Sequence, residues 1–382
     1  IMIKLTPLTS EVIELPPLPP FTTDTLLSEA SALFRFSAPL TMKLAQDLFE
    51  LGLITYHRTD STRISSTGIT IAREYLDTTF GEYAKQVFVP RLWGEGGAHE
   101  GIRPTKPIDA EKLRELIAEG VIETPIRLTP KHYKLYDLIF RRFIASQMKS
   151  AKIERTTYLV EVYMNGMKVH ETMVSIITDV IDPGYMSVYT PIRILNIPKE
   201  EVFLKPSSIE IKYVSDIRTP TQGELIRWMK EVGIGRPSTY AKIVEVLLRR
   251  RYVRERKFLK TLIPRARGIL VYSLLAGLYM PETRDELEKE LDYTISLIAR
   301  IKPRKYTHEE MKNILLSITR NVKPSIQQMV TVDRTSALQK YMQLIEEGES
   351  DYEEVLRELF KEMCENVLAP ELKKVPIEVC RL

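Results

Sequence analysis

The sequence predicts a multi-domain α+β protein in which a β-rich segment lies between two mainly helical ones. The chain has 382 residues, which suits two to four domains at roughly 100 to 200 residues each. Apolar residues recur at helical spacing from about residue 21 to 150 and again after residue 220. Residues 155–214 are instead rich in β-branched and aromatic types, which favour strands.

The first segment is expected to be helical, with one short strand. A helix should end at Gly52, because glycine tolerates the left-handed backbone that often follows a helix. The buried face of this helix would comprise Leu40, Leu44, Leu48 and Leu51. Residues 53–56 then favour a short strand. A later helix is expected to begin with Thr129 as its N-cap and Pro130 at its first position.

The middle segment should contain a β-hairpin. Two strand-like runs, 158–164 and 167–177, are separated by Asn165-Gly166, a pair typical of two-residue hairpin turns. Further short strands are expected up to about residue 214, in the runs IRIL, VFL and IEIKYV.

The last segment is expected to hold a winged-helix-like core. Thr221 and Glu224 are spaced as a capping box, and Gly233 would end the helix that they begin. The buried stripe of that helix would comprise Leu225, Met229 and Val232. Ser238 can cap a second helix, and residues 258–263 are a strand candidate. Two helices joined by a glycine-containing turn and followed by strands are typical of winged-helix modules.

Charge is unevenly distributed although the formal net charge is only +4. Residues 242–267 contain ten Lys or Arg against two Glu, and residues 344–372 contain ten acidic residues. The basic stretch indicates either a face for a polyanion or a solvated helix end. Glu349, Asp351 and Glu353 alternate in the acidic stretch, but they are expected to form a solvated helix start rather than a metal site.

The composition excludes several classes of protein. The two cysteines, Cys364 and Cys380, form no CxxC motif, so a zinc site of the CxxC…CxxC type is excluded within this chain. So few cysteines favour a reducing, cytoplasmic setting. No run of 18 apolar residues is present, and the first residues do not resemble a secretory signal. Asn (5) and Gln (8) are scarce, which favours a thermophile.

The strongest candidate for chemistry is the motif TYHRTDS at residues 55–61. In a strand-like backbone, Tyr56 and Arg58 point to the same face. A phenol normally has a pKa near 10, and an adjacent guanidinium favours the phenolate and can bind a phosphate oxygen. A tyrosine that attacks a phosphodiester needs this arrangement. Taken alone, however, the motif also fits a half-buried strand tyrosine beside a surface arginine.

Two further motifs suit phosphate binding. In GGAHEGIRPT (96–105), glycines permit close backbone approach, and His99 and Arg103 could reach phosphates. In GIGRPSTYA (233–241), a turn exposes N–H groups at a helix start, with Arg236 adding charge. The other candidate ligands of this segment are Ser238, Thr239 and Tyr240, the last as a stacking face. In isolation the first motif is a glycine-rich surface loop and the second a plain capped helix start.

The four segments PFTTDTLLSEAS (20–31), LGLITYHRTDSTRIS (51–65), GAHEGIRPT (97–105) and GIGRPSTYAKI (233–243), in this order, closely resemble type IA DNA topoisomerases. The resemblance extends from about residue 16 to 263, and more loosely to about 362. It implies that Tyr56 is the nucleophile that forms a 5′-phosphotyrosyl bond with one DNA strand. Arg58 would be its electrostatic partner and His99 the family's motif histidine near the scissile phosphate.

The remaining site residues follow from the same resemblance. Single-stranded and underwound DNA would be the partner, held by Thr59, Ser61, Arg103, Arg236, Ser238, Thr239 and Tyr240. The bond energy stored in the ester would allow cleavage, strand passage and religation without ATP.

The family's architecture also gives expected domain boundaries. Residues 1–15 would be the incoming strand of a β-rich arch, and residues 16–150 the helical domain with the tyrosine. Residues 151–215 would form the arch, which acts as a hinge, and residues 216–375 the base with its winged-helix-like core. Together these parts would make an incomplete type IA toroid.

Within the family, PPLPPFTTDTLLSEAS, ITYHRTDSTRIS and the late segment VDRTSALQKYMQLIEEGESDYEEVL resemble the topoisomerase half of an archaeal reverse gyrase. That half would be coupled to an ATP-driven helicase-like half. The family's Toprim domain, whose acidic residues hold Mg²⁺, has no counterpart in this sequence. A Walker motif is not present either. We therefore expect metal ligands outside this chain and little relaxation of plasmid by the chain alone.

Two alternatives of other classes were weighed. A non-enzymatic winged-helix DNA-binding protein, or a catalytically incomplete topoisomerase remnant, would explain the basic stretch at 242–267 and the paired helices. It would not explain why TYHRTDS, AHEGIRPT and IGRPSTY occur together. A tyrosine recombinase forms a 3′-phosphotyrosine, but its tyrosine lies near the C-terminus and follows its arginines and histidine.

Overall fold

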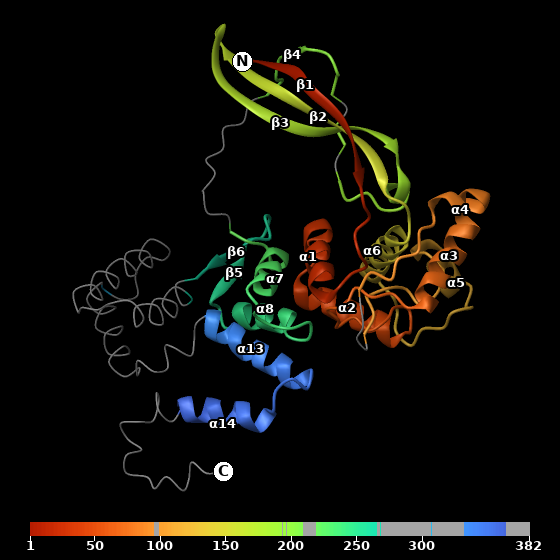
Figure 1. The fold of residues 1–382 in the computed structure, drawn as a ribbon, viewed down its shortest axis with the longest axis vertical. Coiled ribbons are helices and arrows are strands. Elements are labelled where there is room, and N and C mark those ends of the chain that lie inside the picture. The colour runs from red at the N-terminus through yellow and green to blue at the C-terminus, as the bar shows by residue number, and fades with distance from the viewer. Residues whose placement is uncertain are drawn as a thin grey trace. The chain divides into compact units, whose positions relative to one another are not determined.

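The computed structural model describes residues 1–94, 99–192, 194–195, 197–208, 219–265, 268, 307 and 332–363. The chain divides into two compact units, whose helices and strands are labelled in Figure 1. The first comprises Ile1–Leu26 and Leu40–Arg218, and the second comprises Leu27–Pro39 and Thr219–Leu382. Residues 27–39, which the sequence grouped with the tyrosine-bearing segment, therefore pack with the second unit.

The β part of the first unit is a four-stranded sheet with the order β3-β2-β1-β4, antiparallel throughout. Its strands are β1 (Met2–Leu15), β2 (Ala151–Met164), β3 (Met167–Asp182) and β4 (Val202–Leu204). The predicted Asn165-Gly166 turn joins β2 and β3, and both of its residues have positive φ, 51° and 83°. Positive φ at both positions is what a type I′ hairpin requires, so this prediction is confirmed.

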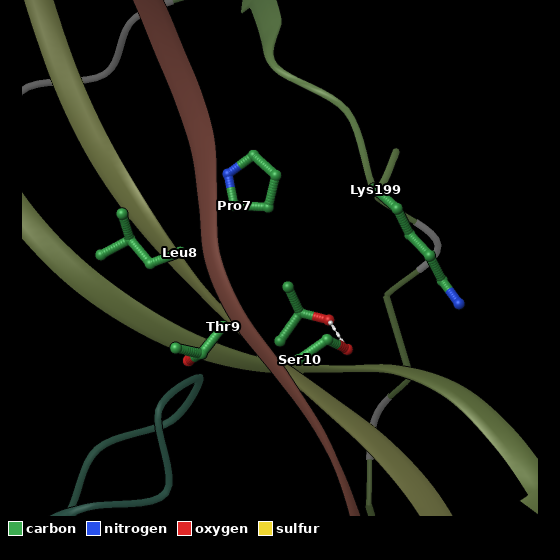
Figure 2. Close-up of a pocket in the computed structure, with 6 residues that line it drawn as sticks. Pro7, Leu8, Thr9, Ser10 and Lys199 are labelled. Atoms are coloured by element: carbon green, nitrogen blue, oxygen red, sulfur yellow. Dashed lines mark hydrogen bonds between the residues drawn. The ribbon is translucent and has the colours of Figure 1, made fainter.

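The pairing of β1 has an irregularity near the middle of the strand. Its pairing with β2 shifts between Pro7 and Thr9, because proline cannot donate a ladder hydrogen bond. A pocket lies at this bulge (Figure 2), lined by Pro7, Leu8, Thr9, Ser10, Thr156 and Lys199. None of the predicted site residues lines it.

The helical part of the chain's first 150 residues is confirmed. The helices are α1 (Thr23–Phe34), α2 (Ala38–Glu50), α3 (Ser66–Phe80), α4 (Ala84–Val87), α5 (Ala110–Ala118) and α6 (Pro130–Ser146), with 3-10 turns η1 (Gly81–Tyr83) and, after β3, η2 (Gly184–Ser187). As predicted, α2 is followed by Gly52 with φ +66°, and α6 has Thr129 as N-cap and Pro130 at its first position.

The core of this unit gathers on α6. Leu135, Ile139 and Phe143 are fully buried, and so is Leu48 of α2. Their spacing in α6 is close to one helical turn, which places them on one face. Burying a side chain of this size is worth about 1.5 to 3 kcal/mol, so the buried face of α6 contributes strongly to the stability of this unit.

The second unit contains two helices followed by a two-stranded hairpin, which is the order of elements that the sequence predicted. Its elements are α7 (Gln222–Glu231), α8 (Tyr240–Arg249) and the two-stranded hairpin of β5 (Val253–Glu255) and β6 (Leu262–Pro264). The capping box is confirmed, because Thr221 accepts from the Glu224 N–H at 3.2 Å and Glu224 accepts from the Thr221 N–H at 2.6 Å. Gly233 follows α7 with φ +74°, as expected.

The α1 end and α7 meet within this unit. The Gln222 side chain accepts from the Ala38 N–H at 2.8 Å, and Arg227 donates to the Ser28 hydroxyl at 2.9 Å. A Cβ on Gly223 would lie 2.8 Å from the Ser28 Cα, so only glycine permits this approach. These contacts explain why residues 27–39 belong to the second unit.

Several local predictions for this unit were wrong. The buried apolar side chains of α7 are Ile226 and the predicted Met229, whereas Leu225 and Val232, also predicted to be buried, are only half-buried. Thr239, not Ser238, is the N-cap of α8. The strand expected at 258–263 begins only at Leu262, which pairs with Glu255. The preceding residues belong to the loop that is closed by hydrogen bonds of Arg256 with Lys260 and Thr261.

Two further helices are α13 (Val332–Glu346) and α14 (Tyr352–Met363). The predicted acidic helix start is confirmed, because the Asp351 carboxylate accepts from the N–H groups of Glu353 and Glu354 at 2.7 and 3.1 Å. The strand predicted in IEIKYV (209–214) and both cysteines lie outside the described residues. So does much of the helical stretch expected between 265 and 331.

Candidate functional site

The backbone of the TYHRTDS motif is anchored at both ends. Ile54 forms a single antiparallel bridge with Pro104, and the Thr55 N–H donates to the Arg103 carbonyl at 2.9 Å. The Thr105 N–H donates to the Leu53 carbonyl at 3.1 Å. The strand predicted at 53–56 is thus reduced to one bridge, which fixes TYHRTDS against the IRPT end of the second motif.

Thr23 at the start of α1 holds the other end of the motif. Its hydroxyl donates to the His57 carbonyl at 2.8 Å and accepts from the Thr59 N–H at 2.9 Å. The Thr23 N–H donates to the Thr59 carbonyl at 2.9 Å. This gives the FTTDT part of the sequence a specific task, which is to hold the turn that carries Tyr56. Sequence reasoning quoted this segment but assigned it no role.

Side chains along the motif alternate between solvent and core. Tyr56 is 39% exposed and Arg58 is also exposed, whereas His57 and Thr59 are each 1% exposed. An extended backbone produces this alternation. It brings the two residues with the predicted chemistry to the solvent side and leaves His57 in the interior. Thr59 is buried, and its hydroxyl accepts from the Ser61 N–H at 3.0 Å. It therefore shapes the turn, and its predicted contact with DNA stays a prediction.

Aromatic rings surround Tyr56 on three sides. Its ring centroid lies 5.3 Å from that of Phe49 and 5.6 Å from that of His57, both in edge-to-face geometry. The His99 ring lies 5.6 Å away at an angle of 34°. Such contacts fix the direction of a half-exposed tyrosine at little entropic cost. The structure thus brings His99 next to Tyr56, although they are 43 positions apart in the sequence.

His57 is a buried imidazole without a hydrogen-bond partner among the described residues. Burial is the main cause that lowers its pKa from 6.5 to about 4, and the positive charge of Arg58 adds to the effect. His57 is therefore neutral at physiological pH. The charge that faces the Tyr56 side is carried by Arg58.

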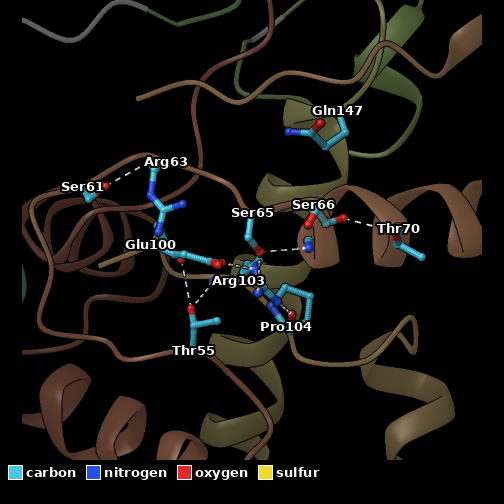
Figure 3. A network of polar contacts seen from close by, with 12 residues as sticks. Thr55, Ser61, Arg63, Ser65, Ser66, Thr70, Glu100, Arg103, Pro104 and Gln147 are labelled. Atoms are coloured by element: carbon cyan, nitrogen blue, oxygen red, sulfur yellow. Dashed lines mark hydrogen bonds and ion pairs between the residues drawn. The ribbon is translucent and has the colours of Figure 1, made fainter. Parts of the chain in front are cut away.

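Arg103 is part of a buried polar network (Figure 3). It is 6% exposed, its Nε donates to Glu100 at 2.6 Å, and its Nη1 donates to the Pro104 carbonyl at 3.0 Å. Burial alone would raise the pKa of the Glu100 carboxyl, but hydrogen bonds from Arg103 and Ser65 outweigh it and hold the pKa below its ordinary value. Arg103 thus fixes residues 100–104, which follow His99 in the chain, and it presents little surface to DNA.

The GIGRPSTYA segment of the second unit differs from its predicted role in one respect. Tyr240 is 5% exposed, and its ring packs on Gly235, where an added Cβ would lie 3.0 Å away. Its ring is therefore no exposed platform for a base. Ser238 and Thr239 are exposed, as contact with DNA would require. Arg236 is half-exposed and donates to the Gln339 carbonyl of α13 at 2.8 Å.

The described residues do not fit a metal site. No group of three or more His, Cys, Asp or Glu side chains among them could hold an ion. Glu100, the carboxylate next to the candidate site, is already committed to Arg103. In the same part of the chain, no helix combines the length and apolar character needed to cross a membrane.

Comparisons with known proteins show which family the chain resembles. A family model described as DNA topoisomerase matches residues 2–296. A reverse gyrase from Pyrococcus furiosus is 42% identical over 93% of the chain, and reverse gyrase 1 from Aeropyrum pernix is 41% identical over 93%. The chain spans 25% of the length of each. Reverse gyrase 1 from the bacterium Aquifex aeolicus is 40% identical over 93% of the chain and 26% of its own length.

The fold comparison gives the same result. Full-length topoisomerase I from Thermotoga maritima matches with a TM-score of 0.61 and 28% identity, over 95% of this chain and 52% of that one. The mixed helical and sheet architecture is thus a topoisomerase-like α+β fold.

Proposed function

The chain belongs to the type IA DNA topoisomerase family, and on that premise we propose that it carries the nucleophile which cuts and rejoins one DNA strand. The observation that supports this is the setting of Tyr56. Its phenol is 39% exposed, with the exposed His99 ring beside it and Arg58 exposed two residues later. On the inner side, the ring contacts the half-buried Phe49 and the buried His57.

In the proposed reaction, the Tyr56 phenol oxygen attacks a backbone phosphorus of single-stranded or underwound DNA. A new bond from oxygen to phosphorus forms, and the bond from phosphorus to the 3′ oxygen of the preceding nucleotide breaks. The phenol loses its proton, and the leaving oxygen gains one and becomes a 3′ hydroxyl. The product is a 5′-phosphotyrosyl ester, and its reversal after strand passage restores the DNA.

The neighbouring side chains would act on the attacked phosphate. Arg58 can donate to two phosphate oxygens and offset the negative charge that develops during attack. His99, whose ring lies beside that of Tyr56, can donate to the same phosphate. Phe49 and His57 would keep the phenol pointed at the substrate, which is a matter of orientation rather than of bonding. Because the ester conserves the bond energy, this step needs no ATP.

The similarity to reverse gyrases supports a second level of the proposal. The chain would serve as the strand-cutting part of a reverse-gyrase-like enzyme, in which a helicase-like part uses ATP to direct strand passage toward positive supercoiling. Mg²⁺ would be supplied by a Toprim domain, and neither Mg²⁺ nor ATP would be bound by this chain. The chain alone is then expected to bind single-stranded DNA and to leave a supercoiled plasmid unrelaxed. Robust Mg²⁺-dependent relaxation by the chain alone would contradict this.

The test of the nucleophile is a covalent-adduct assay with the full-length protein and a labelled single-stranded oligonucleotide. Tyr56→Phe should abolish the adduct that survives denaturation. Tyr83→Phe is the matched control, because Tyr83 is 42% exposed, close to the 39% of Tyr56, and lies on the same unit. This control should retain the adduct. An adduct that persists in Tyr56→Phe would remove Tyr56 from the reaction.

A further inference from the structure

The tip of the hairpin between β5 and β6 is a closed and well-fixed loop. The Arg256 N–H donates to the Thr261 carbonyl at 2.8 Å, and the Lys260 N–H donates back to the Arg256 carbonyl at 3.0 Å. Lys260 has φ +57°, which turns the chain sharply at this point. Within the same unit, Arg35 donates to the Phe258 carbonyl at 3.2 Å. The loop 257–259 is therefore held in one orientation before any ligand arrives.

This loop presents two large apolar side chains to solvent. Phe258 is 78% exposed and Leu259 is 63% exposed. Phe258 is the most exposed large hydrophobic side chain in the described part of the chain. A phenyl ring on a fixed loop keeps its face available and loses little conformational entropy when it stacks on a partner.

Positive charge surrounds the ring. Arg254 and Arg256 alternate with Glu255, so both point outward from the hairpin and both are exposed. The Lys257 ammonium lies 5.9 Å from the Phe258 ring centroid. The side chains of Arg254 and Arg256 form no hydrogen bond or ion pair with another described residue.

The single acidic residue of the hairpin points the other way. Glu255 is half-buried, and its carboxylate accepts from Lys260 at 3.0 Å and from the Gln222 amide at 2.9 Å. Its charge is thus neutralised on the inner face. The outer face therefore carries three cationic side chains and the exposed Phe258 ring, with the Lys257 ammonium close to that ring.

We propose that this tip, residues 254–259, is a binding site for single-stranded DNA in which Phe258 stacks on an unpaired base. Arg254, Arg256 and Lys257 would contact the phosphates on either side of that base. An aromatic ring among cations is the combination that single-strand binding proteins use, because every base has a stacking face and every linkage a charge. The choice of DNA as ligand rests on the proposed function.

Another kind of surface fits the observations less well. Cations around apolar side chains also occur where proteins touch anionic membranes. Two apolar side chains bury little area in a bilayer, however, and stable membrane attachment needs a larger apolar face or a second anchor. Binding to anionic lipid vesicles is therefore included below as a competing outcome.

The experiment measures the affinity of the full-length protein for a labelled single-stranded oligonucleotide of mixed sequence. Phe258→Ala should weaken binding about 5- to 150-fold, the range that corresponds to the loss of one base–aromatic stack. Phe258→Trp should bind as tightly as wild type. Phe258→Leu should bind as weakly as Phe258→Ala, because leucine is apolar but has no stacking face. Phe203→Ala is the matched control, since Phe203 is 56% exposed and lies 5.8 Å from the Lys4 ammonium.

A second oligonucleotide, with abasic sites in place of most bases, identifies the partner of the ring. Wild type and Phe258→Ala should bind it equally, because it offers no base for the stack. Equal binding of the two proteins to the mixed-sequence strand would overturn the proposal, as would full rescue by Phe258→Leu. If Phe258→Ala bound anionic vesicles more weakly than wild type but kept its affinity for DNA, the tip would be assigned to a membrane instead.

These readouts are independent of cleavage. A strand that binds through Phe258 but forms no adduct at Tyr56 would contradict the proposed function and leave this site in place. Normal adduct formation at Tyr56, together with an unchanged DNA affinity of Phe258→Ala, would overturn this binding site and leave the proposed function in place.

Discussion

His57 should make the first unit less stable in acid. Its pKa is lowered from 6.5 to about 4 in the folded chain. Because the folded value is the lower one, the unfolded chain binds a proton at this residue between pH 6.5 and 4 and the folded chain does not. Stability is therefore complete above about pH 6.5 and is lost as the pH falls toward 4. One pKa unit corresponds to about 1.4 kcal/mol, so the expected loss from pH 7 to pH 5 is about 2 kcal/mol.

The assay compares urea unfolding of wild type and His57→Phe at pH 7 and pH 5. Phenylalanine keeps a ring beside Phe49 and Tyr56 and removes the titrating group. Wild type should lose about 2 kcal/mol more than His57→Phe over this range. At pH 7 the variant should be no less stable than wild type, because the imidazole nitrogens of His57 have no partner among the described residues. The difference between the two proteins cancels the other titrating groups.

The control is His170→Phe, because His170 is exposed on β3. It should follow wild type at both pH values. If wild type and His57→Phe lose stability in parallel, the burial of a neutral imidazole next to Tyr56 is wrong, and so is the assignment of local charge to Arg58.

Three other predictions follow from single contacts. Gly68→Ala should destabilise the chain by about 1 to 3 kcal/mol in thermal unfolding, because its Cβ would lie 2.9 Å from Arg103 Nε, whereas Thr67→Ala at an exposed position should change little. Gly166→Ala should lower the stability of the β2–β3 hairpin by about 1 to 2 kcal/mol, since φ at Gly166 is +83°; an unchanged melting temperature would argue against the type I′ turn. Arg236→Gln should weaken single-strand binding and reduce its salt slope by about 1, and an unchanged slope would limit Arg236 to its contact with α13.

Local sequence rules predicted the features that local sequence determines. The Asn165-Gly166 turn, the capping box at Thr221 and the glycine after α2 were all confirmed, because backbone conformation and capping depend on a few neighbouring residues. The division of the chain into a helical, a β-rich and a second helical segment could be predicted for the same reason.

Features that depend on side-chain packing and strand pairing were not predicted. Phe258 was expected in a strand, but it occupies a loop tip, because the pairing with β5 starts only at Leu262. Tyr240 was expected to be an exposed stacking face, but Gly235 leaves room for its ring in the interior. The pairing of Glu100 with Arg103 follows from a spacing of three residues, which the sequence did show and the prediction overlooked.

The candidate site shows the same division. The motif order indicated that Tyr56, Arg58 and His99 act together, and the structure places His99 next to Tyr56. The role of Thr23 could not be seen in the sequence, because its hydrogen bonds reach residues more than 30 positions away.

The most direct test of the account is to locate the covalent bond itself. The adduct of the full-length protein with a single-stranded oligonucleotide would be digested with protease and nuclease and analysed by mass spectrometry. The account predicts one modified peptide, with the nucleotide attached through its 5′ phosphate to Tyr56. A nucleotide on any other residue, or one attached through its 3′ phosphate, would contradict it.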